Sequence, residues 1–269
     1  MRMDLVRPDQ VAQAVKRASI AYVPIGAVEY HGPHLPLGVD MVTAAGVCER
    51  ACVQTGGVVL PPSYLAIGTL DLPWTLCFSN RLVERWAEEI VDQLHSRGFA
   101  QVVLVTGHGP LDFVHLLKRV ARSRSGKDKS AYTACYLEFN AALLAGPELD
   151  EPTVIDHAST VETSWMLALQ PETVDLRALP EEPHATPVGV YGRNPRFTAS
   201  ASRGTVQLAG AARDATPGRN AGRPRRLAHV RALLLVRTTR TRAHGRRDNR
   251  RAQPGPGIAL SDRYPVGLP

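Results

Sequence analysis

Short apolar stretches alternate with longer segments of helical periodicity along the first two thirds of the chain. The runs at 19–26, 58–62, 101–109 and 131–137 are rich in β-branched and apolar residues, which is typical of buried strands. Between and after them the pattern predicts helices at 9–17, at 40–57, between Ser79 and Gly98, at 111–123 and at 159–169. Such alternation predicts an α/β fold in three layers, α/β/α, with a mostly parallel central sheet.

Capping residues predict where several of these helices begin. Asp9 and Ser79 are suitable N-caps, because their side-chain oxygens can accept hydrogen bonds from the first free backbone N–H groups. Asp40 stands where the second helix is expected to begin, and Gly56 and Gly57 are expected to end it. Asp40 therefore has two possible roles. It could be an N-cap, or it could be a ligand at a helix start, where the helix dipole favours negative charge.

The alternation of strand and helix ends near residue 213. From 213 to 251 the chain has thirteen Arg and two acidic residues, so this segment carries +11. The whole chain carries +7, which leaves −4 for all other residues. We expect a globular domain over 1–212 and an irregular tail, rich in Arg, Pro and Gly, over 213–269.

Composition argues against several classes of protein. No apolar run approaches the roughly 20 residues that a membrane-spanning helix needs, and the polar N-terminus does not resemble a secretory signal. The four cysteines lack CxxC spacing, so we expect reduced thiols and a cytoplasmic location. No Ser or Cys lies in a setting such as GxSxG, which argues against a serine or cysteine hydrolase.

The stretch VEYHGPHLPLGVD, residues 28–40, places groups that bind protons and metals among turn-forming residues. Glu29 and His31 are two residues apart, so on an extended segment their side chains point to the same side and make half of a metal site. Asp40 could add a carboxylate whose two oxygens bridge two cations. His34 does not share this spacing, and we expect a structural role for it.

Two further segments could complete such a site. His108 lies between glycines at the end of a predicted central strand, where ligands gather in α/β sheets, although it could equally be a hydrogen-bonded turn residue. Glu162, in DHASTVETS, lies on a predicted helix with few charges, whereas an isolated helical Glu is usually solvated. His157 beside Asp156 could act as a general acid or base, with its tautomer set by a carboxylate partner.

Three motifs, VPIGAVEYHGPHLPLGVD, GFAQVVLVTGHG and DHASTVETS, together resemble the creatininase (creatinine amidohydrolase) family. The resemblance covers about residues 15–205. The family includes the mycofactocin-system creatininase-like peptidase and an archaeal formamide-cleaving deformylase. The resemblance implies a creatininase-like fold, two divalent metal ions such as Zn, Mn or Fe, and a homo-oligomer, frequently a hexamer. It also implies hydrolysis of an amide C–N bond in a cyclic amide, a formamide or a small peptide-like substrate.

The resemblance assigns roles residue by residue. The implied metal ligands, with Asp40 as the bridge, are Glu29, His31, Asp40, His108 and Glu162. His157 corresponds to the proton shuttle, so His157 and Glu162 are the implied catalytic residues. In this mechanism a metal-activated water attacks the carbonyl group, and His157 protonates the leaving nitrogen.

The chain departs from the family pattern in two places. The usual NGHGGN is TGHGPLD here, with Thr106 in place of an Asn and Pro110 with Leu111 in place of a Gly-Asn turn. Residues 64–79 replace a family segment that contains a His, and they contain none. We therefore expect a substrate that differs from those of characterised members.

Three alternatives remain open at this stage. The protein could hydrolyse a lactone or an amidine with the same fold, or it could be a catalytically degenerate member that still binds metal. The Arg-rich tail could attract the phosphates of nucleic acid. It has no aromatic interleaving and no known motif, which argues against nucleic acid as a partner.

The end of the domain raises a separate question. Family members normally finish soon after a motif like GRNPRFTASASRG (192–204), with one more amphipathic helix. We expect the residues after Arg203 to lose that helix, because Arg, Pro and Gly take over. A shifted reading frame in GC-rich DNA would produce such a change, and a natural basic extension is the alternative. We expect the residues from about 213 onward to contribute nothing to the active site.

Overall fold

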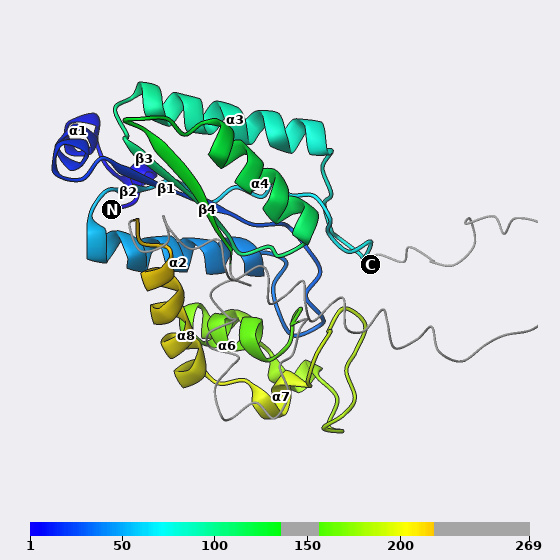
Figure 1. The fold of residues 1–269 in the computed structure, drawn as a ribbon. Helices are drawn as coiled ribbons and strands as arrows, with labels where there is room; N and C mark the ends of the chain where they lie inside the picture. The colour runs from blue at the N-terminus through cyan, green and yellow to red at the C-terminus, as the bar shows by residue number, and fades with distance from the viewer. Residues whose placement is uncertain (136–155, 218–269) are drawn as a thin grey trace, which may run out of the picture. The chain divides into compact units, whose positions relative to one another are not determined.

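A parallel four-stranded sheet forms the centre of the computed structural model of the protein (Figure 1), which describes residues 1–135 and 156–217. All of these residues belong to one compact unit, Met1–Pro224. The strands, in the spatial order β2-β1-β3-β4, are β1 (Ile20–Ile25), β2 (Val58–Val59), β3 (Gln101–Thr106) and β4 (Ser130–Cys135). β1 and β3 pair along their full lengths, so their carboxyl ends lie side by side.

One face of the sheet is covered by α1 (Pro8–Arg17), α3 (Asn80–Ser96) and α4 (Leu111–Ser123). Alternate strand residues supply the two faces of the sheet. In β3, Val102 and Leu104 join the core under these helices, whereas Val103 and Val105 join the core on the opposite face. This alternation follows from the two-residue period of a strand.

The opposite face is covered by α2 (Val39–Thr55), α6 (Thr160–Leu169) and α8 (Ala201–Asp214). The backbones of α6 and α8 lie so close that a Cβ atom on Gly204 would collide with the carbonyl oxygen of Ser164. The buried Trp165 donates a hydrogen bond of 2.9 Å from Nε1 to Gln207 Oε1, which joins the same two helices. These two helix layers and the sheet between them confirm the predicted three-layer α/β fold.

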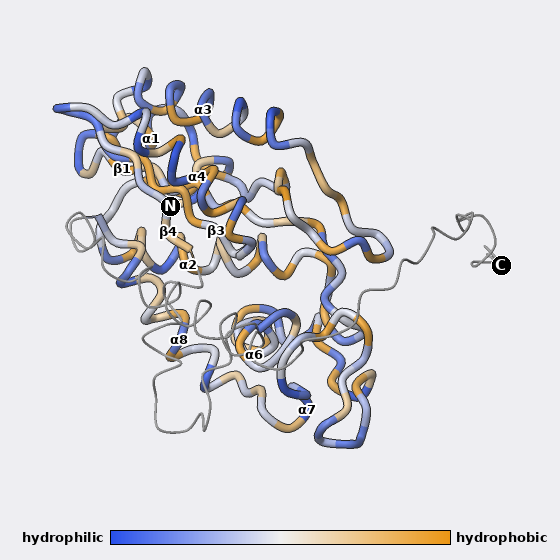
Figure 2. Tube along the Cα trace, turned by 45° about the vertical axis from the view of Figure 1, so that its right-hand side comes forward, coloured by the Kyte–Doolittle hydropathy of each residue, from blue (hydrophilic) through white to orange (hydrophobic). Residues whose placement is uncertain are grey.

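The described part of the chain also contains four shorter helices: the 3-10 helices η1 (Met3–Leu5), η2 (Pro171–Thr173) and η3 (Leu176–Ala178), and α7 (Pro195–Thr198). Figure 2 shows apolar positions concentrated along β1 and β3, while the surrounding helices carry hydrophilic positions as well. Among the described residues, no helix is both long enough and apolar enough to cross a membrane.

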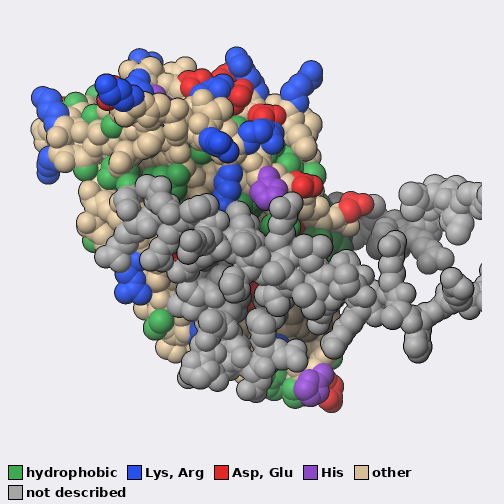
Figure 3. Space-filling model, viewed as in Figure 1, with side chains coloured by type: hydrophobic (Ala, Val, Ile, Leu, Met, Phe, Trp, Pro, Cys, Tyr) green, Lys and Arg blue, Asp and Glu red, His purple; other side chains and the backbone are tan. Residues whose placement is uncertain are grey.

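The outer surface of α3 and α4 carries a mixture of charges, visible at the top of Figure 3. Arg119 forms an ion pair of 2.7 Å with Glu84, and Arg124 forms one of 3.1 Å with Glu88. Ion pairs at the surface contribute little to stability. Acidic and basic groups alternate here, so this helical surface has no continuous basic patch of the kind that binds nucleic acid.

Most predicted elements form, with small changes at their ends. The helix at 111–123 is found as predicted, and Ser79 caps α3 by accepting a hydrogen bond from Leu82 N. Asp9 is not a cap, because α1 begins at Pro8 and its N-cap is Arg7. Proline suits the first helical position, since its fixed φ is already helical. The predicted strand 58–62 is reduced to Val58–Val59, and the part of strand 131–137 beyond 135 lies outside the described residues.

The prediction that the chain loses its last helix after Arg203 is wrong. Residues 201–214 form α8, whose N-cap Ser200 accepts a hydrogen bond from Arg203 N. Leu208, Ala211 and Ala212 on this helix are fully buried against α2 and α6. The small apolar residues of α8 allow it to pack closely against its neighbouring helices. This packing stabilises the helix, although its composition is not strongly apolar. The tail from 218 onward lies outside the described residues.

Two glycines allow the first turn of α2 to pack against the strand ends. A Cβ on Gly26, directly after β1, would lie 2.6 Å from the carbonyl carbon of Asp40. A Cβ on Gly107, directly after β3, would collide with the carbonyl oxygen of the same residue. Both neighbours are backbone atoms, which cannot rotate away. Asp40 is therefore held between the ends of the two central strands.

We expect Gly107→Ala to displace Asp40 and to destabilise the protein by about 1–3 kcal/mol, the usual cost of overpacking a close contact. Gly126→Ala is the matched control, because an added Cβ there meets nothing within 4 Å. Urea unfolding of both variants, together with metal analysis, tests this expectation. Equal stability and equal metal content in the two variants would contradict it.

Candidate metal centre

Five acidic and histidine side chains meet at the carboxyl ends of β1 and β3. Glu29 and His31 follow β1, His108 follows β3, and the first turns of two helices contribute Asp40 from α2 and Glu162 from α6. All five residues are at most 4% exposed. They form two groups with ligand atoms within 4.8 Å of one another, namely Glu29–Asp40–His108 and His31–Asp40–Glu162. The structure thus brings together every metal ligand implied by the sequence.

Asp40 belongs to both groups, and its two oxygens face different histidines. Oδ2 lies 3.0 Å from Nδ1 of His108, and Oδ1 lies 3.2 Å from Nε2 of His31. Each histidine also faces a second carboxylate. His108 Nδ1 is 3.1 Å from Glu29 Oε2, and His31 Nε2 is 3.5 Å from Glu162 Oε2. A carboxylate placed in this way can bridge two cations. The alternative role of Asp40 as an N-cap is excluded, because the N-cap of α2 is Gly38.

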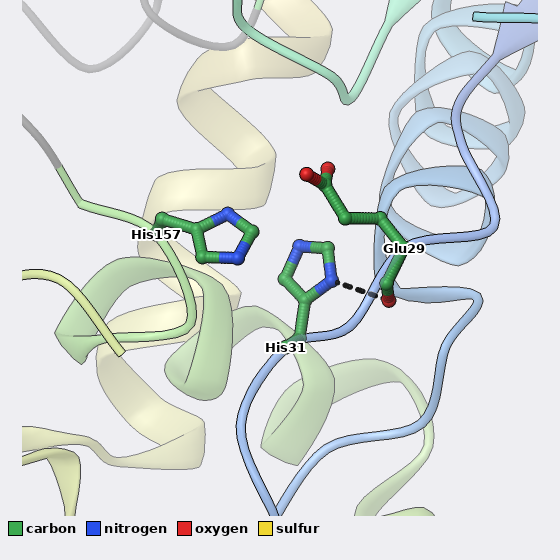
Figure 4. A group of neighbouring side chains, drawn as sticks. All are labelled: Glu29, His31 and His157. Atoms are coloured by element: carbon green, nitrogen blue, oxygen red, sulfur yellow. Dashed lines mark hydrogen bonds between the residues drawn. The ribbon is translucent and has the colours of Figure 1, made fainter. Parts of the chain in front are cut away.

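Main-chain carbonyl groups set the tautomers of both histidines. His31 Nδ1 lies 3.0 Å from the carbonyl oxygen of Glu29 (Figure 4), and His108 Nε2 lies 3.1 Å from that of Ile67. A carbonyl oxygen only accepts hydrogen bonds, so these ring nitrogens are the protonated ones. The opposite nitrogens, which face the carboxylates, keep lone pairs in the neutral ring. This is the usual arrangement around a metal-binding histidine.

Backbone N–H groups orient two of the carboxylates. Glu29 Oε1 accepts a hydrogen bond of 2.6 Å from Leu70 N, and Glu162 Oε2 accepts one of 2.5 Å from Ala158 N. Ala158 has a φ of 54°, in the left-handed region that non-glycine residues rarely adopt. The fully buried surroundings of Ala158 hold this conformation and aim its N–H at Glu162.

In the part of the chain that the structure describes, the centre contains no permanently charged cation to balance its carboxylates. Three carboxylates are buried together, while no Lys or Arg among the described residues is buried. Glu29 Oε2, His31 Nε2 and Asp40 Oδ2 have no hydrogen-bond partner of suitable geometry within the described residues. Buried groups of this kind are stable when they are paired or when they coordinate metals. Oxygen and imidazole donors in two groups of three suit zinc, manganese or iron.

Mutual interactions shift the pKa values of these groups. Burial lowers the pKa of His31, but the charges of Asp40 and Glu162 outweigh it and raise that pKa to about 9. Burial likewise lowers the pKa of His108, but the adjacent carboxylates of Asp40 and Glu29 outweigh it and raise that pKa to about 10. For Glu162, burial raises the pKa to about 8. Without cations, the cluster therefore retains extra protons at neutral pH.

His157 lies beside these ligands, at the edge of the cluster. Its ring centroid is 4.2 Å from that of His31, and Figure 4 shows the two rings next to the carboxylate of Glu29. Nε2 lies 3.0 Å from the carbonyl oxygen of Tyr30, so Nε2 is the protonated nitrogen. Burial and the charge of His31 lower the pKa of His157, so the ring is neutral at pH 7. Glu29, His31 and His157 form a third group with metal-binding geometry.

Asp156 does not set the tautomer of His157, contrary to the expectation that a carboxylate would do so. Its carboxylate accepts hydrogen bonds from Val161 N, at 3.1 Å, and from Glu162 N, at 3.4 Å. It therefore satisfies free N–H groups in the first turn of α6. Burial raises the pKa of Asp156 to about 6. Asp156 orients the helix that carries Glu162, and the tautomer of His157 is set by Tyr30.

His34 has the structural role expected for it. Its Nε2 shares a hydrogen bond of 2.9 Å with Thr163 Oγ1, next to Glu162 on α6. Burial lowers the pKa of His34 to about 4, and the charge of His31 adds to this effect. The neutral ring thus connects the loop after β1 to α6.

Tyr30 is a residue that the sequence analysis missed. Its N–H donates to Thr75 Oγ1 at 3.0 Å, and its carbonyl oxygen accepts from His157. Its ring packs on the backbone of Gly189, where an added Cβ would lie 2.5 Å from Tyr30 Cδ1. One indication of this role was present in the sequence, because Tyr30 lies between two candidate ligands in VEYHG. Its contacts are made mostly by the main chain, which has no sequence signature.

Comparison with known proteins agrees with this geometry. The family model described as "Creatinine amidohydrolase" matches residues 5–224. A creatinine amidohydrolase of Pseudomonas putida is 28% identical over 66% of this chain and 76% of its own length. A 3-dehydro-scyllo-inosose hydrolase of Thermotoga maritima is 26% identical, and a mycofactocin precursor peptide peptidase of Mycolicibacterium smegmatis is 31% identical. The alignments cover 61% and 56% of this chain, and 54% and 58% of those two relatives.

Solved structures share the fold. A crystal structure of creatinine amidohydrolase has a TM-score of 0.66 at 21% identity, covering 83% of this chain and 98% of that chain. A second structure, described as a mutant creatininase of Zn-Zn type, has a TM-score of 0.65 at 21% identity, covering 83% of this chain and 98% of its own. A third, described as "Creatininase Mn", has the same TM-score, identity and coverage as the second.

We expect metal binding to release protons. When no cation is present at neutral pH, His31 and His108 each carry a second ring proton, which the metal must displace. Protons compete for the same nitrogens as the metal, so affinity must rise with pH below the pKa values of about 9 and about 10. Each displaced proton should change the Kd about tenfold per pH unit. Calorimetric titration of chelator-treated protein with Mn²⁺ or Zn²⁺ in buffers of different ionisation enthalpy counts these protons. A Kd that does not change between pH 6 and pH 8 would contradict this assignment.

Proposed function

We propose that this chain, which belongs to the creatininase family, is a metal-dependent hydrolase that cleaves an amide C–N bond. The observation that carries the proposal is the pair of buried ligand groups that share Asp40. The relatives named as creatinine amidohydrolase and peptide peptidase support an amide substrate. We place the substrate among cyclic amides, formamides and small peptide-like molecules.

The proposed ligands are Glu29, His108 and one oxygen of Asp40 for one cation, and His31, Glu162 and the other oxygen of Asp40 for the second. The structures described as Zn-Zn type and Mn creatininase support zinc or manganese as the metal. Two bound divalent cations supply Lewis acidity, which acidifies water and polarises a carbonyl group. The protein residues fix the ligand geometry and exclude bulk water.

His157 is the proposed proton carrier. Its neutral ring can accept a proton from the attacking water and then give it to the leaving nitrogen. The hydrogen bond from Nε2 to Tyr30 leaves Nδ1 free for this exchange. The geometry near Glu29 and His31 would also allow His157 to bind a metal, so its role needs a direct test.

A second candidate function is hydrolysis of a bond other than an amide. The Thermotoga maritima relative is named as a 3-dehydro-scyllo-inosose hydrolase, and this name specifies no amide. Metal-loaded protein should therefore be assayed against cyclic amides, formamides and short peptides, with lactones and cyclic ketones in parallel. Hydrolysis of the last two classes alone would favour the second candidate.

We further propose that the protein is a cytoplasmic homo-oligomer. Cys48 and Cys52 are buried thiols that form no disulfide bond, which supports a reducing compartment. The family resemblance supports a hexamer. Sedimentation equilibrium of the metal-loaded protein measures the assembly directly.

Asp40→Ala should abolish binding of both cations, because one side chain serves both ligand groups. We expect metal content near zero by mass spectrometry and no hydrolysis of any substrate that the unchanged protein cleaves. Asp112→Ala is the matched control, since Asp112 is an exposed acid in the first turn of α4. Full metal content in the Asp40→Ala variant would contradict the proposal that Asp40 is a bridging ligand.

His157→Asn should retain both cations and lower turnover by about 100-fold or more, the usual scale for loss of a general acid or base. Metal content and turnover are measured on the same preparation. The proton-transfer role predicts that only turnover falls. If metal content falls in parallel with turnover, His157 is a ligand.

A further inference from the structure

Trp74 occupies an unusual backbone position. Residues 72–75 form a turn closed by a hydrogen bond of 3.2 Å from Thr75 N to the carbonyl oxygen of Leu72. Pro73 and Trp74 are its central residues, and Trp74 has a φ of 66°. This is the pattern of a type II turn, in which the third position favours glycine or asparagine. A bulky aromatic residue is disfavoured at that position, because a positive φ brings its side chain into steric conflict with its own backbone.

The side chain of Trp74 is also unfavourably placed for stability. It is 78% exposed, whereas Trp165 is completely buried. A connecting turn would gain from glycine at this position, because glycine adopts positive φ freely and exposes no apolar surface. Exposed aromatic residues in strained positions are typical of functional sites.

The turn is attached to the segment that carries the metal ligands. On one side, Leu70 N donates to the carboxylate of Glu29 at 2.6 Å. On the other, Thr75 Oγ1 accepts from Tyr30 N at 3.0 Å, and Leu76 N donates to Val28 O at 2.9 Å. Trp74 is therefore held at the tip of a loop whose two sides contact residues 28–30, directly beside the proposed centre. The loop belongs to residues 64–79, where the chain departs from the family pattern.

A second exposed aromatic side chain lies on the other side of Tyr30. The backbone at Gly189 packs on the ring of Tyr30, and an added Cβ there would lie 3.3 Å from Leu72 Cδ1. Two residues further, Tyr191 pairs with the backbone of His157, and its half-exposed ring lies 5.9 Å from that of His157. Two loops, each with an exposed aromatic residue, thus meet at Tyr30, whose carbonyl oxygen accepts the hydrogen bond from His157.

We propose that Trp74 is a specificity-determining residue, which stacks on a flat, unsaturated group that adjoins the scissile bond of the substrate. The inference rests on the proposed function, because it assumes a metal-bound substrate at the centre. An indole face recognises planar groups by stacking. The preferred substrates are therefore amides with an aromatic or conjugated ring next to the carbonyl, in preference to small aliphatic amides.

Two hydroxamates test this inference, because they share one metal-binding group and differ only in the attached substituent. Benzohydroxamate carries a phenyl ring and acetohydroxamate carries a methyl group. Their Kd values are measured by calorimetry on Mn²⁺-loaded protein, with Trp74→Gly and Trp74→Phe as variants. Leu82→Ala is the control, since Leu82 is an exposed apolar residue on α3.

We expect Trp74→Gly to weaken benzohydroxamate binding about five- to tenfold, the scale of one aromatic stacking contact. Acetohydroxamate binding should stay within about twofold, and Trp74→Phe should retain most of the preference. The melting temperature of Trp74→Gly should be unchanged or higher, because glycine relieves the positive φ. Leu82→Ala should alter neither Kd.

The inference is overturned if Trp74→Gly leaves the benzohydroxamate Kd unchanged or weakens both hydroxamates equally while metal content is retained. It is also overturned if sedimentation shows that Trp74→Gly dissociates an oligomer, since Trp74 would then contact a second copy. If the unchanged protein binds neither Mn²⁺ nor either hydroxamate, the proposed function itself fails.

Discussion

The close contact of α2 with the ends of β1 and β3 is the constraint on which the centre depends. Gly26 and Gly107 leave space for the backbone of Asp40 between two neighbouring parallel strands. The same strands end in the loops that carry Glu29 and His108. Because β1 and β3 are paired in register, those loops start at the same level of the sheet. Helix packing and ligand placement are therefore consequences of a single backbone contact.

That contact carries an electrostatic cost. It brings a buried carboxylate at a helix N-terminus close to two others, and among the described residues no buried Lys or Arg balances their charge. Burial would raise the pKa of Asp40, but His31 and His108 hold it well below its usual range. Protons on the imidazoles can balance part of this charge, and divalent cations can balance all of it. The centre is thus suited to exchange protons for metal ions.

The sequence predicted the layers of the fold and the residues that the structure brings together in the candidate centre, because both depend on local patterns. Strand ends, glycine turns and the spacing of Glu29 and His31 are visible in the order of residues. The last helix was not predicted, since α8 is stabilised by the close approach at Gly204 and not by a strong apolar periodicity. The role of Asp156 was also misjudged. Asp156 is next to His157 in sequence, but its carboxylate accepts hydrogen bonds from free N–H groups of the following helix, α6.

The second layer of contacts around the centre is made chiefly by the main chain. Carbonyl groups of Glu29, Ile67 and Tyr30 orient the three histidines, and N–H groups of Leu70 and Ala158 orient two carboxylates. Such support is encoded in the path of the backbone and not in the identity of the supporting side chains. Side chains in the loops around the centre can therefore change without removing the hydrogen bonds that orient the candidate ligands, which gives these loops freedom to fit different substrates.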